Sequence, residues 1–562
     1  MRLLTRAALL LVPVATLAAA TSGRTSAPRE MTLLVAATTD VHGHLVGWDY
    51  YANRPDTARG LARAATIVDS LRAAAPGRVV LVDAGDMLQG TPLTYAAAVA
   101  ARRGKLGVHP VFAAMNAMHY DAAAVGNHEF NYGLAILHSA ARGARFPLLA
   151  ANAYAATGPA PFPGRTIVER DGVRIALIGA TTPGSNAWDK DNLSGKLAIG
   201  AIVPAVRAQV DSARRDHADV IVVVMHTGLG EPSSYDTIAT RLPSENVAAE
   251  VARAVPGIDL IVYGHSHKQM ADTVIAGTLL MQPKNWATNV AVAALQLEQG
   301  EGSWRVASKS SSLIQCAGHA ENVAVATAVA VGHEAARTYV ATTIGTSDVR
   351  WSADSGRVID TPLADLILEV ERRTAHSDLA STAVFDVGAT IDSGAVTVGE
   401  IARLYPYENT LTAVRISGAQ LKAYLEHSAR YYGTFGTSEP AVHADVPGYD
   451  FDIVAGADYT IDLSRPIGSR ITSLTVRGKP VSDGDSFTLA LNNYRRSGGG
   501  GYAMLRDAPE VFNSATEIRD LLIAEVERRK HIAPNDYFQR NWSIVPAAAI
   551  SPAYTATHHW TQ

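Results

Sequence analysis

Short apolar runs alternate with helix-sized spacers through the first half of the chain. Seven of these runs have the length and residue types of β-strands: 33–37, 79–82, 122–125, 147–150, 174–178, 220–225 and 260–263. Nearly continuous apolar strands separated by such spacers are typical of a sheet that is covered on both faces. The pattern therefore predicts an α/β fold for this part of the chain.

Polar side chains follow five of these runs closely. They include Asp40 and His42, then Asp86, then the hexapeptide Gly126-Asn127-His128-Glu129-Phe130-Asn131, then His226, and finally His265 and His267. Ligands of α/β proteins gather at the carboxyl ends of strands, so these side chains are expected to share one site. We expect Gly126 to be glycine because the corner after its strand needs an unusual backbone angle.

Each of these pieces also has a purely structural interpretation. Asp40 and His42 could belong to a surface turn, Asp86 to an ordinary turn, and His226 could be a hydrogen-bonded core histidine. The ordered occurrence of all five pieces favours a metal site instead. Its candidate ligands are Asp40, His42, Asp86, Asn127, His226, His265 and His267.

Seven nitrogen and oxygen ligands exceed what one zinc or manganese ion takes from a protein. They suit two divalent ions, such as Zn, Mn, Co or Mg, that share a bridging carboxylate. Two ions about 3.5–4 Å apart can stabilise both the attacking and the leaving oxygen of a phosphoryl transfer. A phosphoester is therefore the expected substrate class.

Length, charge and cysteine content narrow the possibilities. A chain of 562 residues is too long for one core and predicts two domains. Its 49 Lys and Arg against 53 Asp and Glu provide no basic field for a nucleic acid polymer. Cys316 is the single cysteine, which excludes an intrachain disulfide and a thiolate metal cluster.

The N-terminus has the three-part design of an export signal. Arg2 and Arg6 precede the apolar run 7–17, and Ala18-Ala19-Ala20 follows it. The run is too short to span a membrane stably. We expect residues 1–20 to be a signal peptide and the mature protein to be periplasmic or extracellular.

The second half predicts a helix and then a mixed domain. The alanine-rich stretch 320–341 predicts a helix that connects two domains. Thr361 and Pro362 have the residue types of an N-cap and a first helical position. Alternating patterns predict strands at 451–454, 459–463, 471–476 and 487–491.

Two stretches of the second half are candidates for substrate recognition. One contains Tyr407 and Asn409, and the other contains Tyr494 just before a run of four glycines. This run lacks the lysine and hydroxyl residues of a P-loop. From the residues alone, both tyrosines are better explained as core or edge-strand residues.

The ordered motifs resemble those of the calcineurin-like metallophosphoesterases. The surrounding sequence is similar to the 5′-nucleotidase family, and more so to its 2′,3′-cyclic-nucleotide 2′-phosphodiesterase/3′-nucleotidase branch, through stretches such as Thr38-Thr39-Asp40-Val41-His42-Gly43 and Trp188-Asp189-Lys190. The resemblance implies an αββα sandwich at 31–318, a linker helix at 319–345, an α+β 5′-nucleotidase-type domain at 346–545 and a tail at 546–562.

The resemblance also implies roles for individual residues. Asp40, His42, Asp86 and His267 would hold one ion, while Asp86, Asn127, His226 and His265 would hold the other. His128 would be catalytic, with Asn131 standing where the 5′-nucleotidase branch has aspartate. Tyr407 and Tyr494 would stack on the base, with Asn409 beside them. The stretch 388–392 lacks an arginine that this branch commonly has, and Arg495 or Arg496 could replace it.

These expectations define one main function and several alternatives. The main function is an exported, monomeric hydrolase that converts 2′,3′-cyclic nucleotides and 3′-nucleotides to nucleoside and phosphate. The first alternative is a 5′-nucleotidase or nucleotide-sugar hydrolase. More remote ones are a sulfur-oxidation thiol hydrolase of similar fold and a non-catalytic nucleotide-binding surface protein.

Overall fold

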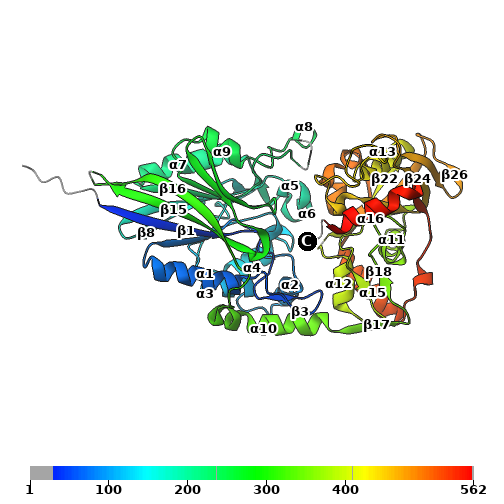
Figure 1. The fold of residues 1–562 in the computed structure, drawn as a ribbon, viewed down its shortest axis with the longest axis horizontal. Helices are drawn as coiled ribbons and strands as arrows, with labels where there is room; N and C mark the ends of the chain where they lie inside the picture. Colours follow the sequence, from blue (N-terminus) through cyan, green and yellow to red (C-terminus); the bar gives the residue numbers. More distant parts are fainter. Residues whose placement is uncertain (1–28, 234, 236, 301, 408, 560–562) are drawn as a thin grey trace, which may run out of the picture.

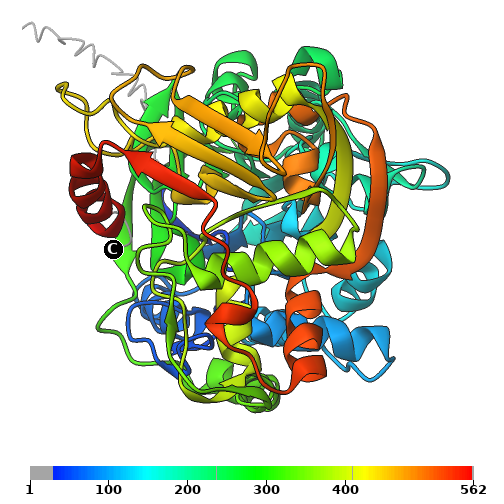
Figure 2. The ribbon, with the colours of Figure 1, turned by 90° about the vertical axis from the view of Figure 1, so that its right-hand side faces the viewer.

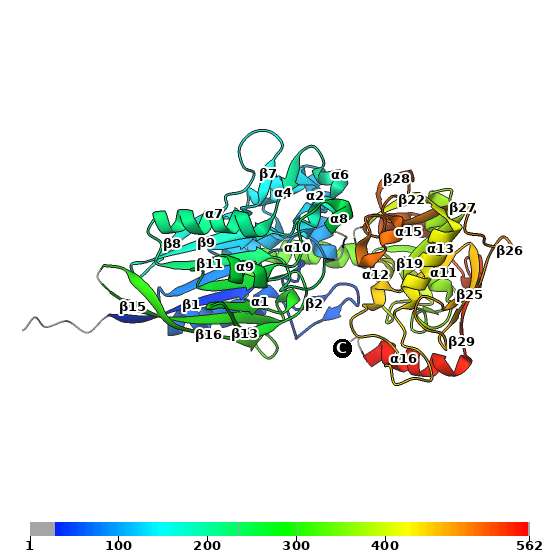
Figure 3. The same ribbon diagram turned by 90° about the horizontal axis from the view of Figure 1, so that it is seen from above.

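The protein folds into two lobes that lie side by side and are joined by one helix (Figure 1). The computed structural model describes residues 29–559 apart from 234, 236, 301 and 408, so the expected signal peptide lies outside the described residues. The connecting helix, α10 (Val323–Val340), runs along one side of the molecule, and the view from above shows it reaching from one lobe to the other (Figure 3).

Two six-stranded sheets form the first lobe. The first has the order β16 (Trp304–Gln315), β15 (Asn289–Gln299), β1 (Glu30–Thr38), β4 (Val79–Asp83), β5 (Ala122–Ala124) and β6 (Leu148–Leu149). The second has the order β13 (Met270–Ile275), β14 (Thr278–Gln282), β12 (Leu260–Tyr263), β11 (Val220–His226), β9 (Val173–Thr181) and β8 (Arg165–Arg170). All seven predicted strands are present, and β1, β4, β5 and β6 run parallel, as do β9, β11, β12 and β14.

The two sheets pack face to face and are covered outside by helices. Their inner faces share one apolar core, to which Val35 and Val82 of the first sheet and Val222 and Val262 of the second contribute. Helices α1 (Leu61–Ala74), α3 (Pro110–Ala117), α4 (Leu134–Ala141) and α10 cover the first sheet, and α7 (Ile202–Arg215) and α9 (Ala248–Ala254) cover the second. The implied αββα sandwich is confirmed. The apolar pattern alone predicted one sheet, because a buried strand does not reveal whether a helix or a sheet covers it.

The second lobe has the predicted α+β character. Its larger sheet has the order β23 (Asp452–Ala455), β19 (Leu379–Ala383), β27 (Ser486–Asn492), β22 (Thr410–Ser417) and β28 (Glu510–Glu517). A smaller one has the order β26 (Lys479–Pro480), β25 (Ile471–Val476), β24 (Ala457–Asp462) and β29 (Trp542–Val545). Helices α11 (Pro362–Thr374), α13 (Gly418–Ala429) and α15 (Ile518–Arg529) pack against these strands.

Two details of the second lobe differ from the sequence-based expectation. Thr361 is the N-cap of α11, with Pro362 at the first position, but the Thr361 hydroxyl is buried without a hydrogen-bond partner and caps nothing. The stretch expected as a tail contains helix α16 (Ile550–His559), which lies at the edge of the lobe (Figure 2). Its Ala553 and Thr557 are buried, so this segment is part of the folded lobe.

Among the described residues, no helix combines the length and apolar character that crossing a bilayer requires.

Candidate active site

The seven predicted metal ligands converge where β1, β4, β5, β11 and β12 end. His226 Nε2 lies 2.9 Å from Asp86 Oδ2, and His265 Nδ1 lies 3.2 Å from His226 Nε2. On the other side of Asp86, His42 Nε2 lies 3.9 Å from Asp86 Oδ2 and 3.0 Å from His267 Nε2. The side chains that are scattered in sequence therefore form one continuous cluster.

The geometry of this cluster fits two divalent ions. The donor atoms of Asp40, His42 and His267 lie within 4.8 Å of one another, and so do those of Asp86, His226 and His265. The side-chain oxygen of Asn127 is buried and has no hydrogen-bond partner, so it is available to coordinate a cation. Asp86 belongs to the second group and also lies 3.9 Å from His42 of the first, where a bridging carboxylate is needed.

Backbone strain marks the same residues. Five of the seven ligands have positive φ angles, namely Asp40 (48°), His42 (48°), Asp86 (62°), His265 (72°) and His267 (53°). Such angles are uncommon for residues other than glycine, and they persist where the surrounding structure enforces them, often at functional sites. The strand ends are thus bent so that their side chains face a common point.

Gly126 is required for space rather than for an unusual backbone angle. A Cβ atom at this position would lie 2.1 Å from Asp86 Oδ1 and 2.4 Å from the Asp86 amide nitrogen. Its φ is not among the positive values, so the angle-based expectation was wrong. At Gly264, likewise, a Cβ atom would lie 2.0 Å from Thr39 Oγ1, beside Asp40.

Glu129 of the same hexapeptide holds the two central ligand loops together. Its carboxylate accepts hydrogen bonds from the backbone amides of Asp86, Met87, Leu88 and Gly126, at 2.6 to 3.0 Å. Charge-assisted bonds of this kind are strong and directional. Glu129 therefore fixes the loop after β4 against the loop after β5, a role that the sequence did not reveal.

The acidic and imidazole groups of the cluster shift one another's pKa values. Burial alone would raise the pKa of Asp86, but His226 and His128 hold it well below its usual range. Burial would lower the pKa of His226, but the Asp86 carboxylate raises it to about 10. Burial, together with His267 and His128, lowers the pKa of His42 to about 3. Acidic and basic groups with strongly shifted pKa values that gather in one place are typical of functional sites.

His128 stands beside this cluster in a hydrogen-bonded chain. Its Nε2 lies 4.0 Å from Asp86 Oδ2, and its Nδ1 lies 2.6 Å from Asn131 Oδ1. Asn131 Nδ2 in turn donates to Asp189 Oδ1 at 3.0 Å. The predicted pairing of His128 with Asn131 is therefore present, and a carboxylate that was not predicted lies behind it.

A cavity of about 480 Å³ between the lobes joins the cluster to the predicted substrate residues. Asp86, Asn127, His265 and His267 line it from the first lobe, and Phe385, Tyr407, Asn409, Tyr449 and Tyr494 line it from the second. An adjoining cavity of the same volume shares His128, Trp188, Tyr407, Asn409 and Tyr494. Tyr407 is 36 % exposed, so the core interpretation does not apply to it.

Several residues of this site were not predicted. Glu245 Oε1 lies 2.7 Å from His265 Nε2, and the Trp188 ring stacks on His265 with centroids 5.6 Å apart. Phe385 meets the Tyr407 ring edge-to-face at 5.2 Å. Trp188 and Asp189 belong to a stretch that marked the family resemblance, whereas Glu245 stands in a loop without a recognisable pattern.

Arg495 and Arg496, the two candidates to replace the missing arginine, are both paired with carboxylates. Arg495 is 2 % exposed, and its guanidinium pairs with Asp450 at 3.0 Å and with Asp452 at 2.8 Å. Arg496 Nε lies 2.7 Å from Glu510 Oε2. Both cations are paired within the second lobe, yet Arg495 lines one of the two cavities and Arg496 lines the other. A substrate contact by either of them stays a prediction.

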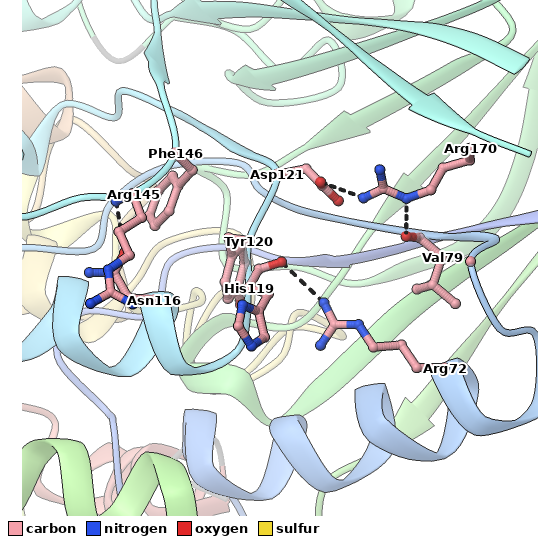
Figure 4. A pocket seen from close by; sticks show the side chains of 10 residues that line it. Arg72, Val79, Asn116, His119, Tyr120, Asp121, Arg145, Phe146 and Arg170 are labelled. Atoms are coloured by element: carbon pink, nitrogen blue, oxygen red, sulfur yellow. Dashed lines mark hydrogen bonds and ion pairs between the residues drawn. The ribbon is translucent and has the colours of Figure 1, made fainter. Parts of the chain in front are cut away.

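A third hollow, of about 390 Å³, lies at the opposite ends of β4 and β5 (Figure 4). It contains several arginines, but Arg170 pairs with Asp121 and also donates to the Val79 carbonyl. Arg72 donates to the His119 carbonyl at 3.1 Å. These cations join loops of the fold, and the hollow is remote from the metal ligands.

Comparison with known proteins identifies both lobes. Residues 33–269 match the family described as calcineurin-like phosphoesterase, and residues 343–507 match the 5′-nucleotidase C-terminal domain. A 2′,3′-cyclic-nucleotide 2′-phosphodiesterase/3′-nucleotidase from Yersinia enterocolitica is 31% identical over 92% of this chain and 89% of its own length. The chain belongs to the 5′-nucleotidase family of calcineurin-like metallophosphoesterases. The resemblance deduced from the motifs is confirmed.

Two further likenesses extend this result. The trifunctional nucleotide phosphoesterase YfkN of Bacillus subtilis is 29% identical over 95% of this chain, which spans 40% of that protein's length. A structure from Staphylococcus aureus, described as a candidate 5′-nucleotidase, superimposes with a TM-score of 0.79 at 26% identity and covers 92% of this chain and 100% of its own. The chain is thus a metal-dependent nucleotide phosphoesterase.

Proposed function

We propose that this chain hydrolyses 2′,3′-cyclic nucleotides and 3′-nucleotides and releases nucleoside and phosphate. The observation that supports this is the cavity between the lobes, which is lined both by predicted metal ligands and by Tyr407 and Tyr494. Such a cavity can hold a phosphate at one end and a base at the other. The similarity to a protein named for these two activities favours the 3′ and cyclic substrates.

The ligand set divides between two ions as the family pattern implies. Asp40, His42, Asp86 and His267 would hold one ion, and Asp86, Asn127, His226 and His265 the other. When bound, such ions neutralise the phosphate and make hydroxide available near neutral pH. Tyr407 and Tyr494 would stack on the base, an interaction that discriminates little among bases.

His128 is the residue proposed to assist the leaving group. Its Nδ1 is engaged by Asn131, so its Nε2 is the atom available to a substrate in the cavity. Nε2 would give a proton to the ribose 2′ oxygen as the cyclic ester opens, and to the 3′ oxygen in the second reaction. Each step consumes one water and transfers one proton to the departing oxygen.

A matrix of metals and substrates tests this proposal. The purified protein, loaded in turn with Zn, Mn or Co, is assayed with 2′,3′-cyclic AMP, 3′-AMP and 5′-AMP. We expect the first two to be hydrolysed. Exclusive cleavage of 5′-AMP would overturn the proposal and establish the 5′-nucleotidase alternative, which the likeness to the Staphylococcus aureus structure favours.

The two tyrosines provide a second test. Replacing Tyr407 or Tyr494 by leucine removes a stacking surface of about 1–3 kcal/mol. We expect KM for nucleotides to rise about tenfold or more, with hydrolysis of p-nitrophenyl phosphate unchanged. Tyr154→Leu, an exposed position on β7 (Ala153–Ala155), is the matched control. Equal effects on both substrates would contradict base stacking.

We further propose that the protein is exported and acts as a monomer. Export rests on the signal-like residues 1–20. An N-terminus near residue 21 in the mature protein and a monomeric mass in solution are the expected results.

A further inference from the structure

Asp189 is a buried carboxylate that the scheme above leaves without a role. It lies between two short helices, α5 (Ser185–Trp188) and α6 (Lys190–Leu193), and is 6 % exposed. None of the ion pairs found among the described residues involves it, and its Oδ2 is buried without a hydrogen-bond partner. A buried carboxylate without a cation is costly, so its presence calls for a function.

Both hydrogen bonds of the Asp189 side chain come from side-chain amides, one of which also contacts His128. Asp189 Oδ1 accepts from Asn131 Nδ2 at 3.0 Å and from Asn192 Nδ2 at 3.4 Å. Asn192 Nδ2 also donates to the carbonyls of Phe130 and Asn131, at 3.0 and 3.2 Å. Asp189 is therefore tied to the turn η1 (His128–Phe130), which carries the catalytic histidine.

The chemistry of these groups fixes the direction of each hydrogen bond between Asp189, Asn131 and His128. Burial raises the pKa of Asp189 to about 6, so the group is ionised above neutral pH and can only accept hydrogen bonds. The amide of Asn131 must then turn its NH₂ toward Asp189 and its oxygen toward His128. An oxygen in that place obliges His128 Nδ1 to carry a hydrogen.

We propose that Asp189 is a positioning residue: through Asn131 it sets the tautomer and the ring orientation of His128, so that Nε2 faces the cleft. Asn131 alone could rotate its amide by half a turn and present NH₂ to the imidazole. Asp189 removes that alternative. The proposal rests on the proposed function for the identity of the ester bond that His128 helps to cleave. The hydrogen-bond geometry does not depend on that function.

We call the hydrogen-bonded series Asp189, Asn131 and His128 the relay. Exchanging the side chains at positions 131 and 189 tests it. Asp189→Asn is nearly isosteric but lets both amides rotate, and we expect kcat to fall about tenfold with KM and metal content unchanged. Asn131→Asp places a carboxylate 3.0 Å from another, and we expect a comparable or larger loss. The double variant Asn131→Asp/Asp189→Asn restores an alternating acceptor and donor, and its kcat should exceed that of Asn131→Asp about tenfold.

Asp483→Asn, at an exposed acidic residue in the loop between β26 and β27, is the matched control and should keep the parent kcat. Circular dichroism and metal analysis verify that each variant is folded and loaded. An unchanged kcat in Asp189→Asn, or a double variant no more active than Asn131→Asp, would overturn the proposal. A merely structural Asp189 predicts no recovery in the double variant.

The assay distinguishes this relay from the proposed function. All variants are compared on p-nitrophenyl phosphate and on whichever nucleotide the parent protein hydrolyses. If the nucleotide class is wrong, the substrate changes but the ratios among the variants remain. If the relay is wrong, the variants do not show the expected kcat ratios, while the activity of the parent protein is unaffected.

Discussion

Left-handed backbone angles allow side chains from several strands to reach one point. Asp86 and His265 adopt φ values of 62° and 72°, which cost energy for any residue with a Cβ atom. Glu129 offsets part of that cost at Asp86, because it binds three consecutive amides of the loop that begins there. The backbone angles and the Glu129 carboxylate together thus orient the ligands before any ion binds.

His128→Ala should separate catalysis from metal binding. Proton transfer by a positioned histidine contributes about 10² to 10⁴ in rate, so kcat should fall at least about 100-fold. The predicted ligands are untouched, and metal content measured by mass spectrometry should match that of the parent. His138→Ala on α4 is an exposed-histidine control that should remain fully active. Near-normal turnover in His128→Ala would exclude the role.

The sequence predicted which residues gather at this site better than how they are held. Asp40, Asp86 and His226 were identifiable because each follows an apolar strand. Glu245 and Asp189 were not, because each reaches the site from a loop whose course depends on tertiary packing. The role of Gly126 was misread for the same reason, since the crowding atom belongs to Asp86, forty residues earlier in the chain.

At the scale of elements, α11 carries an ionisable side chain, Glu371, in an unfavourable place. Glu371 is fully buried, and neither carboxylate oxygen has a hydrogen-bond partner. Burial, reinforced by Asp452, raises its pKa well above the usual value. An acid whose pKa is raised on folding destabilises the native state increasingly as pH rises from its unfolded pKa toward its folded one.

Glu371→Met should therefore stabilise the protein in a pH-dependent way. At pH 5 little of the penalty is present, whereas at pH 8.5 more of it is, so the gain in Tm should be larger at pH 8.5. Each unit of pKa shift corresponds to about 1.4 kcal/mol. Glu369→Met, on the same helix but paired with Arg372 at the surface, should show no such trend. An equal gain at both pH values would refute the explanation.

The strand pattern predicted these elements well but not their partners. The strands 260–263 and 471–476 were located to the residue. Pairing of the antiparallel strands β15 and β16 was not predicted, because solvent-facing polar residues interrupt the apolar run in β16. Sheet order depends on long-range contacts that a single sequence does not display.

At the scale of the whole molecule, a few polar contacts hold the lobes together beside the cavity. Tyr95 of α2 (Pro92–Arg102) donates to Asp520 of α15 at 2.6 Å, and the Arg519 guanidinium lies 4.6 Å from the Tyr95 ring. Burial and the neighbouring Asp520 raise the pKa of Tyr95, so it remains a donor at physiological pH. This contact favours the arrangement in which the cavity is complete.

Tyr95→Phe should loosen that arrangement without unfolding either lobe. Loss of a hydrogen bond to a charged group costs about 1.5–3 kcal/mol. We expect KM for nucleotides to rise about tenfold, with p-nitrophenyl phosphate hydrolysis retained, and the radius of gyration in X-ray scattering to increase. Tyr154→Phe is the control. An unchanged KM and radius would show that this contact does not hold the lobes.

Because one helix joins the two lobes, genetic recombination can exchange one lobe for that of a relative. Every predicted metal ligand precedes α10 in the chain, and the aromatic residues proposed to stack on the base follow it. One crossover within α10 would therefore exchange the selectivity of two related enzymes while each kept its hydrolytic machinery. New substrate ranges can arise in this architecture by recombination, without passing through an inactive ancestor.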